Sequence, residues 1–156
     1  MNPTELGARL QELHTESFGW ALSCCGWDEQ EAEDVLQTTY LKVLSGKARF
    51  EGRSSFRTWL FGVVRRTGLE SHRRRAADRR RVVGLSVAGE EAHPQEGPEM
   101  LMARGEIRRK LREALERLSE RQREVLHLVF YQEMSIAEAA DVMEVSLGSA
   151  WTHYER

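Results

Sequence analysis

Apolar residues recur every three or four positions over most of this chain, which is the spacing of amphipathic helices. One such stretch starts at Asn2, which can cap a helix, with a proline in the first helical position and Glu5 three residues after the cap. It continues toward Cys24. Further stretches follow Asp28 and the two serines near residue 54. The pattern predicts three helices in the first half of the chain.

The third of these helices changes character along its length. Its start carries an apolar face with Phe56, Trp59 and Val63, and we expect Trp59 in the core because it shares this face. Residues 65–81 then hold eight arginines and two carboxylates, a formal charge of +6 in a chain whose total is −2. Such a segment in an otherwise acidic chain indicates a site for a polyanion; the alternative is a solvated helix end without a ligand.

A break in the pattern separates this cationic helix from the rest of the chain. Residues 84–98 contain three glycines, two prolines and three glutamates without periodicity, which predicts a flexible acidic linker. The linker divides the chain into expected domains at 1–83 and 99–156. The expected fold class is all-α, with two small helical domains and a helix-turn-helix in the second.

The helix-turn-helix is predicted from caps and small residues in the second domain. Ser119 and Ser135 are each followed three residues later by Gln or Glu, a capping box that predicts a helix start. After Ser135 come a short helix with Ala140 at the expected crossing, a tight turn with Val145, and a helix capped by Ser146. This pattern is typical of DNA readers whose second helix enters the major groove, and an ordinary helical bundle is the alternative. Residues 147–156 carry one permanent cation, so we expect weak duplex binding by this module alone.

The loop before the cationic helix adds a second kind of contact with nucleic acid. Residues 47–53 place Phe50 among basic residues, and an aromatic ring can stack on an unpaired base while cations follow the phosphates. The first domain is therefore interpreted as a binder of single-stranded or melted DNA. Two weak DNA modules on one tether gain from a raised effective concentration.

Three sequence stretches resemble region 2 of the bacterial extracytoplasmic-function (ECF) sigma factors of the sigma-70 family. They are AEDVLQTTYLKVL at 32–44, RFEGRSSFRTWLFGVVRRT at 49–67 and SHRRR at 71–75. Residues 114–156 resemble region 4 of the same family, and the order and the linker follow its two-domain layout. The resemblance implies a factor that binds core RNA polymerase, directs it to promoters and promotes DNA melting.

The resemblance also implies a role for each group of residues. Contact with the clamp helices of the polymerase β′ subunit falls on Asp34, Gln37, Thr38 and Leu41. The loop that captures a flipped base of the −10 element supplies Lys47, Arg49, Phe50 and Arg53. The helix along the melted −10 strand supplies Arg65, Arg66, Arg73, Arg74 and Arg75. The −35 recognition helix supplies Ser146, Ser149, Trp151, Thr152, His153 and Arg156. Residues 118–131 correspond to the part that meets the polymerase β flap.

Two features depart from the family pattern. Trp151 and His153 stand where the family usually carries lysine or arginine, which predicts weak reading of the −35 element. The family helix also continues past the position of Arg156 with further basic residues, so a C-terminally truncated product or a fragment is expected. Two alternatives therefore stay open: a stand-alone helix-turn-helix regulator, and a truncated factor that acts as an interaction or sequestration module.

The remaining candidate residues do not form a catalytic or metal-binding pattern. Cys24 and Cys25 with His14 could suggest a metal or redox site, but the spacing matches no zinc pattern and a buried apolar role is favoured. His127 is interpreted as a partly buried helix histidine. The sequence contains no HExxH, GxSxG or phosphate-binding glycine loop, so we expect neither an enzyme nor a cofactor.

Location and partners follow from these points. No apolar run approaches the ~20 residues of a membrane helix, so no membrane insertion is expected. The N-terminus lacks the features of a signal peptide, and adjacent cysteines fit a reducing compartment. We expect a cytoplasmic, nucleoid-associated protein. The resemblance implies three partners: core RNA polymerase, promoter DNA and an anti-sigma factor.

Overall fold

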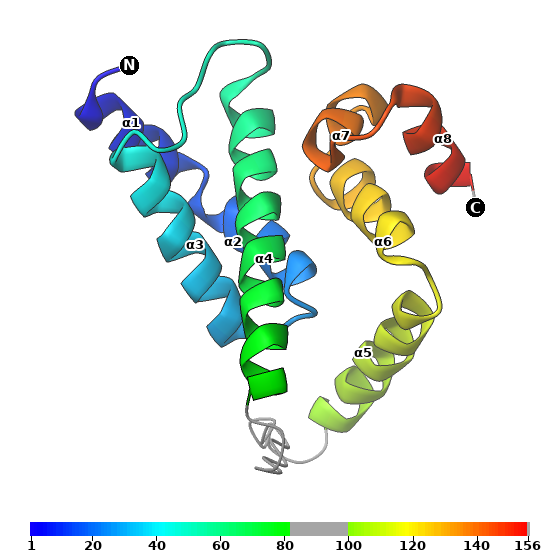
Figure 1. Cartoon of the computed structure of the whole chain (residues 1–156). Coiled ribbons are helices and arrows are strands. Elements are labelled where there is room, and N and C mark those ends of the chain that lie inside the picture. Colours follow the sequence, from blue (N-terminus) through cyan, green and yellow to red (C-terminus); the bar gives the residue numbers. More distant parts are fainter. Residues whose placement is uncertain (82–99, 156) are drawn as a thin grey trace.

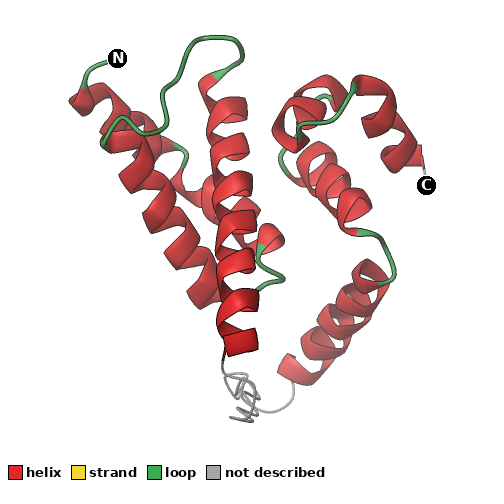
Figure 2. Cartoon of the chain, viewed as in Figure 1, coloured by secondary structure: helices red, strands yellow, loops and turns green. Residues whose placement is uncertain are grey.

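The computed structural model describes residues 1–81 and 100–155, and every regular element within these ranges is a helix (Figures 1 and 2). The all-α prediction is therefore confirmed. The predicted linker at 84–98 lies outside the described residues. No helix in the described ranges is long and apolar enough to cross a membrane.

The first half of the chain forms four helices: α1 (Pro3–Glu12), α2 (His14–Cys24), α3 (Glu29–Leu44) and α4 (Phe56–Arg81). The expectation of one helix running toward Cys24 was wrong, because the helix is interrupted at Leu13, whose ψ of 3° departs from helical geometry. The interruption allows both α1 and α2 to pack against α3. It directs Leu10 of α1 and Trp20 of α2 into two different hydrophobic clusters.

The second half contains α5 (Met100–Glu116), α6 (Glu120–Leu126), α7 (Ile136–Met143) and α8 (Leu147–Glu155). Between α6 and α7 the chain widens into a π-helical turn, η1 (His127–Tyr131). The α7–α8 turn passes through Glu144 in the left-handed conformation, with φ of 56°, and Val145 packs on the core. Helix α8 packs against α6 and α7. Helices α7 and α8 with the turn between them form the predicted helix-turn-helix.

The predicted caps are present with their hydrogen bonds. Asn2 accepts from the Glu5 amide at 2.8 Å, and Asp28 accepts from the Glu31 amide at 3.1 Å. The side chains of Ser119, Ser135 and Ser146 each accept from the amide three residues later, at 3.1–3.2 Å. These local contacts satisfy backbone donors that have no partner inside the helix, and they fix where each helix begins.

The main hydrophobic cluster contains side chains from both halves of the chain. Trp20, Phe61 and Val64 come from α2 and α4, and Leu128 and Val142 come from the second half; all are fully or almost fully buried. Helix α4 packs against α2 and α3 and also against α7 (Figure 1). The domain boundaries at 83 and 99 stay a prediction. Within the described residues, however, the two helical groups share one core.

A second, smaller hydrophobic cluster lies within the first half of the chain. Leu10, Val43, Phe56 and Leu60 are buried there, at the junction of α1, α3 and the start of α4. Trp59 packs against this cluster but is only partly buried, so its predicted core role is confirmed for part of its surface. The exposed remainder borders the candidate site described next.

Candidate nucleic-acid interface

The predicted arginines of α4 fall into two environments. Arg66, Arg73 and Arg74 are exposed, and Arg75 is partly buried. Arg65 is different: its side chain is only 8% exposed, and its Nε donates to Glu124 Oε2 of α6. The structure therefore exposes Arg66, Arg73 and Arg74 to solvent and places Arg65 inside the contact between the two halves.

The predicted base-capture loop is held by glycines and by local hydrogen bonds. Gly46 and Gly52 have φ of 82° and 75°, values that residues with a Cβ rarely adopt. Arg49 Nε donates to the Gly46 carbonyl at 3.3 Å. Phe50 does not project freely, because its ring packs on Phe56, with ring centroids 5.5 Å apart, and also on Trp59. The loop therefore has a partly buried aromatic anchor and outward cations.

A cavity of about 360 Å³ lies between this loop and α4. Its lining combines cations, an aromatic side chain and one carboxylate: Lys42, Lys47, Ala48, Arg49, Trp59, Val63, Arg66 and Glu70. Lys42 Nζ donates to Glu70 Oε2 at 2.8 Å and to Thr67 Oγ1 at 3.1 Å. The hydrogen bond from Lys42 is the main cause that lowers the pKa of Glu70, so this carboxylate is ionised and fixes the lysine.

Sequence reasoning did not assign Lys42, Glu70 or the open side of Trp59 to this site. Lys42 lies on α3 and Glu70 on α4, 28 residues apart, so only tertiary packing brings them together. The single available signal was the position of Lys42 at the end of α3, immediately before the predicted loop. The cavity joins predicted loop residues to Arg66, which continues toward the exposed arginines of α4.

The predicted polymerase-binding residues lie on one exposed side of α3. Leu41 is 68% exposed, which is unusual for a leucine on a helix that also lines the core. Asp34 and Gln37 are exposed and Thr38 is partly buried. Asp34 Oδ2 lies 3.7 Å from the Arg75 guanidinium, so a predicted polymerase contact and a predicted DNA contact form an ion pair.

The predicted recognition helix is exposed but carries no permanent cation within the described residues. Ser146, Ser149, Trp151 and Thr152 are exposed, His153 is partly buried, and Arg156 lies outside the described residues. Thr152 Oγ1 donates to the Gly148 carbonyl at 3.0 Å and is thus turned toward its own backbone. Trp151 packs edge-on against Tyr154, which stacks on Phe130, with centroids 5.9 Å apart in both pairs.

The stretch from α6 to the end of α8 is acidic. Residues 124–155 contain no lysine or arginine. The same stretch holds six carboxylates: Glu124, Glu133, Glu138, Asp141, Glu144 and Glu155. Duplex DNA attracts cations, so this charge pattern opposes tight duplex binding. The DNA contacts predicted for the helix stay a prediction.

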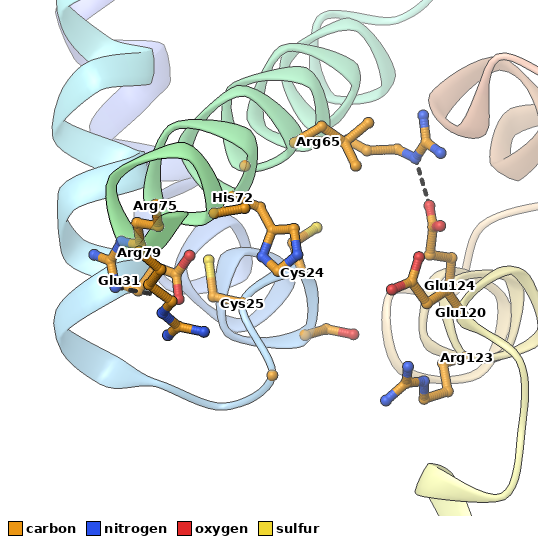
Figure 3. Close-up of a pocket in the computed structure, with 15 residues that line it drawn as sticks. Cys24, Cys25, Glu31, Arg65, His72, Arg75, Arg79, Glu120, Arg123 and Glu124 are labelled. Atoms are coloured by element: carbon orange, nitrogen blue, oxygen red, sulfur yellow. Dashed lines mark hydrogen bonds and ion pairs between the residues drawn. The ribbon is translucent and has the colours of Figure 1, made fainter. Parts of the chain in front are cut away.

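A cleft of about 510 Å³ lies between the halves (Figure 3). Cys24 and Cys25 line it with His72 on one side, and Arg123 lies across from them on α6. Burial raises the pKa of both thiols, that of Cys25 to about 12, so neither is an activated nucleophile. Both pack against the core as predicted. In the described parts of the chain, no three His, Cys, Asp or Glu residues are grouped to hold a metal ion.

His127 lies at the boundary between the two halves. Its ring is 5.4 Å from Trp20 and 4.9 Å from Tyr131, and Gln132 Nε2 lies 3.1 Å from its Nε2. Burial lowers the pKa of His127 to about 4, so the ring is neutral at physiological pH. The interpretation of a partly buried helix histidine is confirmed.

Comparison with known families assigns both halves. The family described as Sigma-70 region 2 matches residues 11–78, and Sigma-70, region 4 matches residues 108–156. The ECF RNA polymerase sigma factor SigX of Bacillus subtilis is 32% identical over 135 residues, 83% of this chain and 68% of that protein. RNA polymerase sigma factor YlaC of the same organism is 31% identical over 81% of this chain and 73% of its own length.

Solved structures show the same fold at lower identity. The sigma factor RpoE, in complex with the anti-sigma factor NepR from Bartonella quintana, matches with a TM-score of 0.74 and 24% identity, over 97% of this chain and 91% of that one. CnrH, in complex with the cytosolic domain of CnrY, matches with a TM-score of 0.66 and 22% identity, over 99% of this chain and 83% of that one. From the two region matches and the identity with SigX and YlaC, the chain belongs to the ECF group of the sigma-70 family of RNA polymerase sigma factors.

Proposed function

We propose that this chain binds core RNA polymerase, directs it to promoters and stabilises the opened −10 region with its first half. It acts by binding and not by catalysis, at the chromosome in the bacterial cytoplasm. The observation that carries the proposal is the cavity between the 46–53 loop and α4, which places Trp59 beside Lys47 and Arg66. An aromatic face with flanking cations suits an unstacked base and its phosphates.

The cationic face of α4 supports the same proposal. Arg66, Arg73 and Arg74 are exposed on the helix that leads away from the cavity. Extruding a base costs a few kcal/mol in lost stacking and pairing, and phosphate contacts offset that cost. A strand whose base enters the cavity would continue along these arginines.

The exposed face of α3 supports a contact with polymerase. Leu41 and Leu44 are 68% and 50% exposed, and Asp34 and Gln37 lie on the same helix. An apolar patch with polar neighbours is typical of a protein-binding surface. We propose this face as the polymerase-docking surface, in agreement with the roles that the resemblance implies.

An anti-sigma factor is a further proposed partner. The similar structures of RpoE and CnrH were each solved with NepR or CnrY bound, as their descriptions state. The fold of this chain matches both over nearly its whole length. A stand-alone duplex regulator is disfavoured, because residues 124–155 carry no lysine or arginine.

The proposal is tested with two sets of variants and one polymerase. Binding of the labelled chain to core polymerase is measured by anisotropy, and promoter opening by permanganate footprinting. The D34A/Q37A variant should weaken polymerase binding, whereas E29A/E33A, which changes two exposed residues of the same helix, should not. The R73A/R74A/R75A variant should keep polymerase binding and lose opening. A matched triple change of cations in α5 and directly after it, R109A/K110A/R117A, should keep both.

Two results would contradict the proposal. Absence of saturable binding at micromolar polymerase would remove the sigma-factor role. Normal melting by the R73A/R74A/R75A variant would show that the α4 arginines do not hold the opened strand.

A further inference from the structure

The outer face of α3 carries exposed residues at the spacing of a coiled-coil seam. Five of its exposed residues, here called the α3 stripe, recur at intervals of four and three: Gln30, Asp34, Gln37, Leu41 and Leu44. Such a stripe follows one side of a helix and fits along a second helix. Helix α4 lies between α3 and the second half of the chain, which leaves this face open to solvent (Figure 1). Residues 30–44 extend over about 21 Å, at 1.5 Å for each helical residue.

The apolar side chains of the α3 stripe are gathered at one end of it. Leu41 and Leu44 are 68% and 50% exposed. Toward the start of α3 the stripe is polar, and Gln30 Nε2 donates to Asp34 Oδ1 at 3.3 Å. Polar residues within a helical seam specify the register of the partner at a cost in affinity. The two leucines alone would therefore hold a partner helix at one end only.

Trp27 places an exposed aromatic side chain at the other end of this face. It stands one residue before Asp28, the cap of α3, and three residues before Gln30. Trp27 is 46% exposed and belongs to neither hydrophobic cluster of the described residues. Its neighbours Cys25 and Gly26 line the cleft between the halves, but Trp27 does not. Tryptophan is enriched among the residues that dominate the affinity of protein interfaces.

The backbone at Trp27 has a conformation that bulky residues rarely adopt. Gly26 and Trp27 follow one another in the left-handed region, with φ of 61° and 69°. The Trp27 amide donates to the Leu22 carbonyl at 2.8 Å, which closes the turn at the end of α2. Glycine or asparagine would satisfy this turn at a lower conformational cost. A half-exposed tryptophan in such a conformation points to a role in binding.

We infer that Trp27 is an aromatic anchor of the polymerase-docking surface, and that this surface extends from the α2–α3 loop to Leu44 and takes a helix of the polymerase along its length. The inference rests on the proposed docking of α3 on core polymerase. It adds a residue to which the family resemblance gives no role. Leu41 and Leu44 contact the partner helix at one end and Trp27 at the other, while Asp34 and Gln37 set its register between them.

The first test measures the affinity of the labelled full chain for core polymerase by anisotropy. The W27N variant removes the ring but keeps a residue that tolerates the left-handed backbone, and W27F keeps an aromatic ring. We expect about tenfold weaker binding for W27N and a much smaller loss for W27F. The control is I107N, which changes a 68% exposed residue of α5 and should bind as the wild type does.

The second test does not depend on the stability of W27N. The photoreactive amino acid p-benzoylphenylalanine in place of Trp27 should cross-link to a polymerase subunit on illumination. The added change D34A/Q37A should remove the cross-link, because it weakens docking of the same face. Thermal midpoints are measured in parallel. We expect that of W27N close to the wild-type value, since relief of the backbone offsets the lost ring contacts.

The outcomes separate this inference from the proposed function. Wild-type affinity of W27N for polymerase would overturn the inference, and so would normal affinity with a loss of promoter opening, which would assign Trp27 to DNA. If W27N unfolds at a much lower temperature, the cross-link decides: its absence assigns Trp27 to the end of α2, and its presence supports docking. Failure of the wild-type chain to bind core polymerase would remove the proposed function instead.

Discussion

Acidification should destabilise this protein through His127. The partly buried imidazole packs between Trp20 and Tyr131, and desolvation lowers its pKa from an ordinary value of 6.5 to about 4. The Gln132 amide nitrogen lies 3.1 Å from His127 Nε2 and can donate to it only while that nitrogen carries no proton. Protonation therefore costs the folded state both desolvation and a hydrogen bond.

The direction and size of the change in the free energy of unfolding follow from proton linkage. Between pH 6.5 and about 4 the unfolded chain holds a proton on this residue and the folded chain does not, so unfolding is favoured as the pH falls. Above pH 6.5 the residue is neutral in both states and adds no pH dependence. The lowered pKa corresponds to a loss of about 2 kcal/mol in the free energy of unfolding at pH 5, and of about 3 kcal/mol once the pH reaches 4.

The assay is urea unfolding at pH 7 and pH 5, followed by circular dichroism. The H127Q variant should lose most of this pH dependence, because glutamine does not titrate. The exposed His72 provides the control, and H72Q should keep the wild-type dependence. The reasoning is refuted if H127Q and the wild type lose the same free energy of unfolding between pH 7 and pH 5.

Two further predictions concern a cap and a thiol. The S135A variant removes the side chain that accepts from the Glu138 amide at 3.1 Å, so it should lower the free energy of unfolding by about 1 kcal/mol in urea titrations; an unchanged midpoint would contradict a capping role. Because burial raises the pKa of Cys25 to about 12, iodoacetamide should modify it slowly at pH 7.5 in the native protein and far faster in urea, as followed by mass spectrometry. Equal rates in the two conditions would contradict this prediction.

The local elements could be predicted because their signals are short-range. A cap and its helix are separated by three residues, so Asn2, Ser119 and Ser135 marked helix starts that the structure has. The interruption at Leu13 could not be predicted in the same way. It has no proline or glycine, and it is favoured because α1 and α2 then both pack on α3.

The candidate site was predictable in part for the same reason. The cationic loop and the arginines of α4 are contiguous in sequence and stand out by composition. The cavity beside them depends on Lys42 and Glu70, which meet only when α3 packs against α4. Phe50 was expected to be available for stacking, but its packing on Phe56 and Trp59 is a tertiary contact.

The sequence by itself determined the helices, their caps, the cationic segment and the family, because each depends on neighbouring residues or on a recurring motif. Only the tertiary structure decided what the charges contact. Arg65 is one of eight arginines in its segment, yet it alone among the described ones is buried, opposite Glu124. That pairing spans 59 residues and follows from the apolar surface that the two halves share, since burial of Trp20 and Leu128 brings the two helices together.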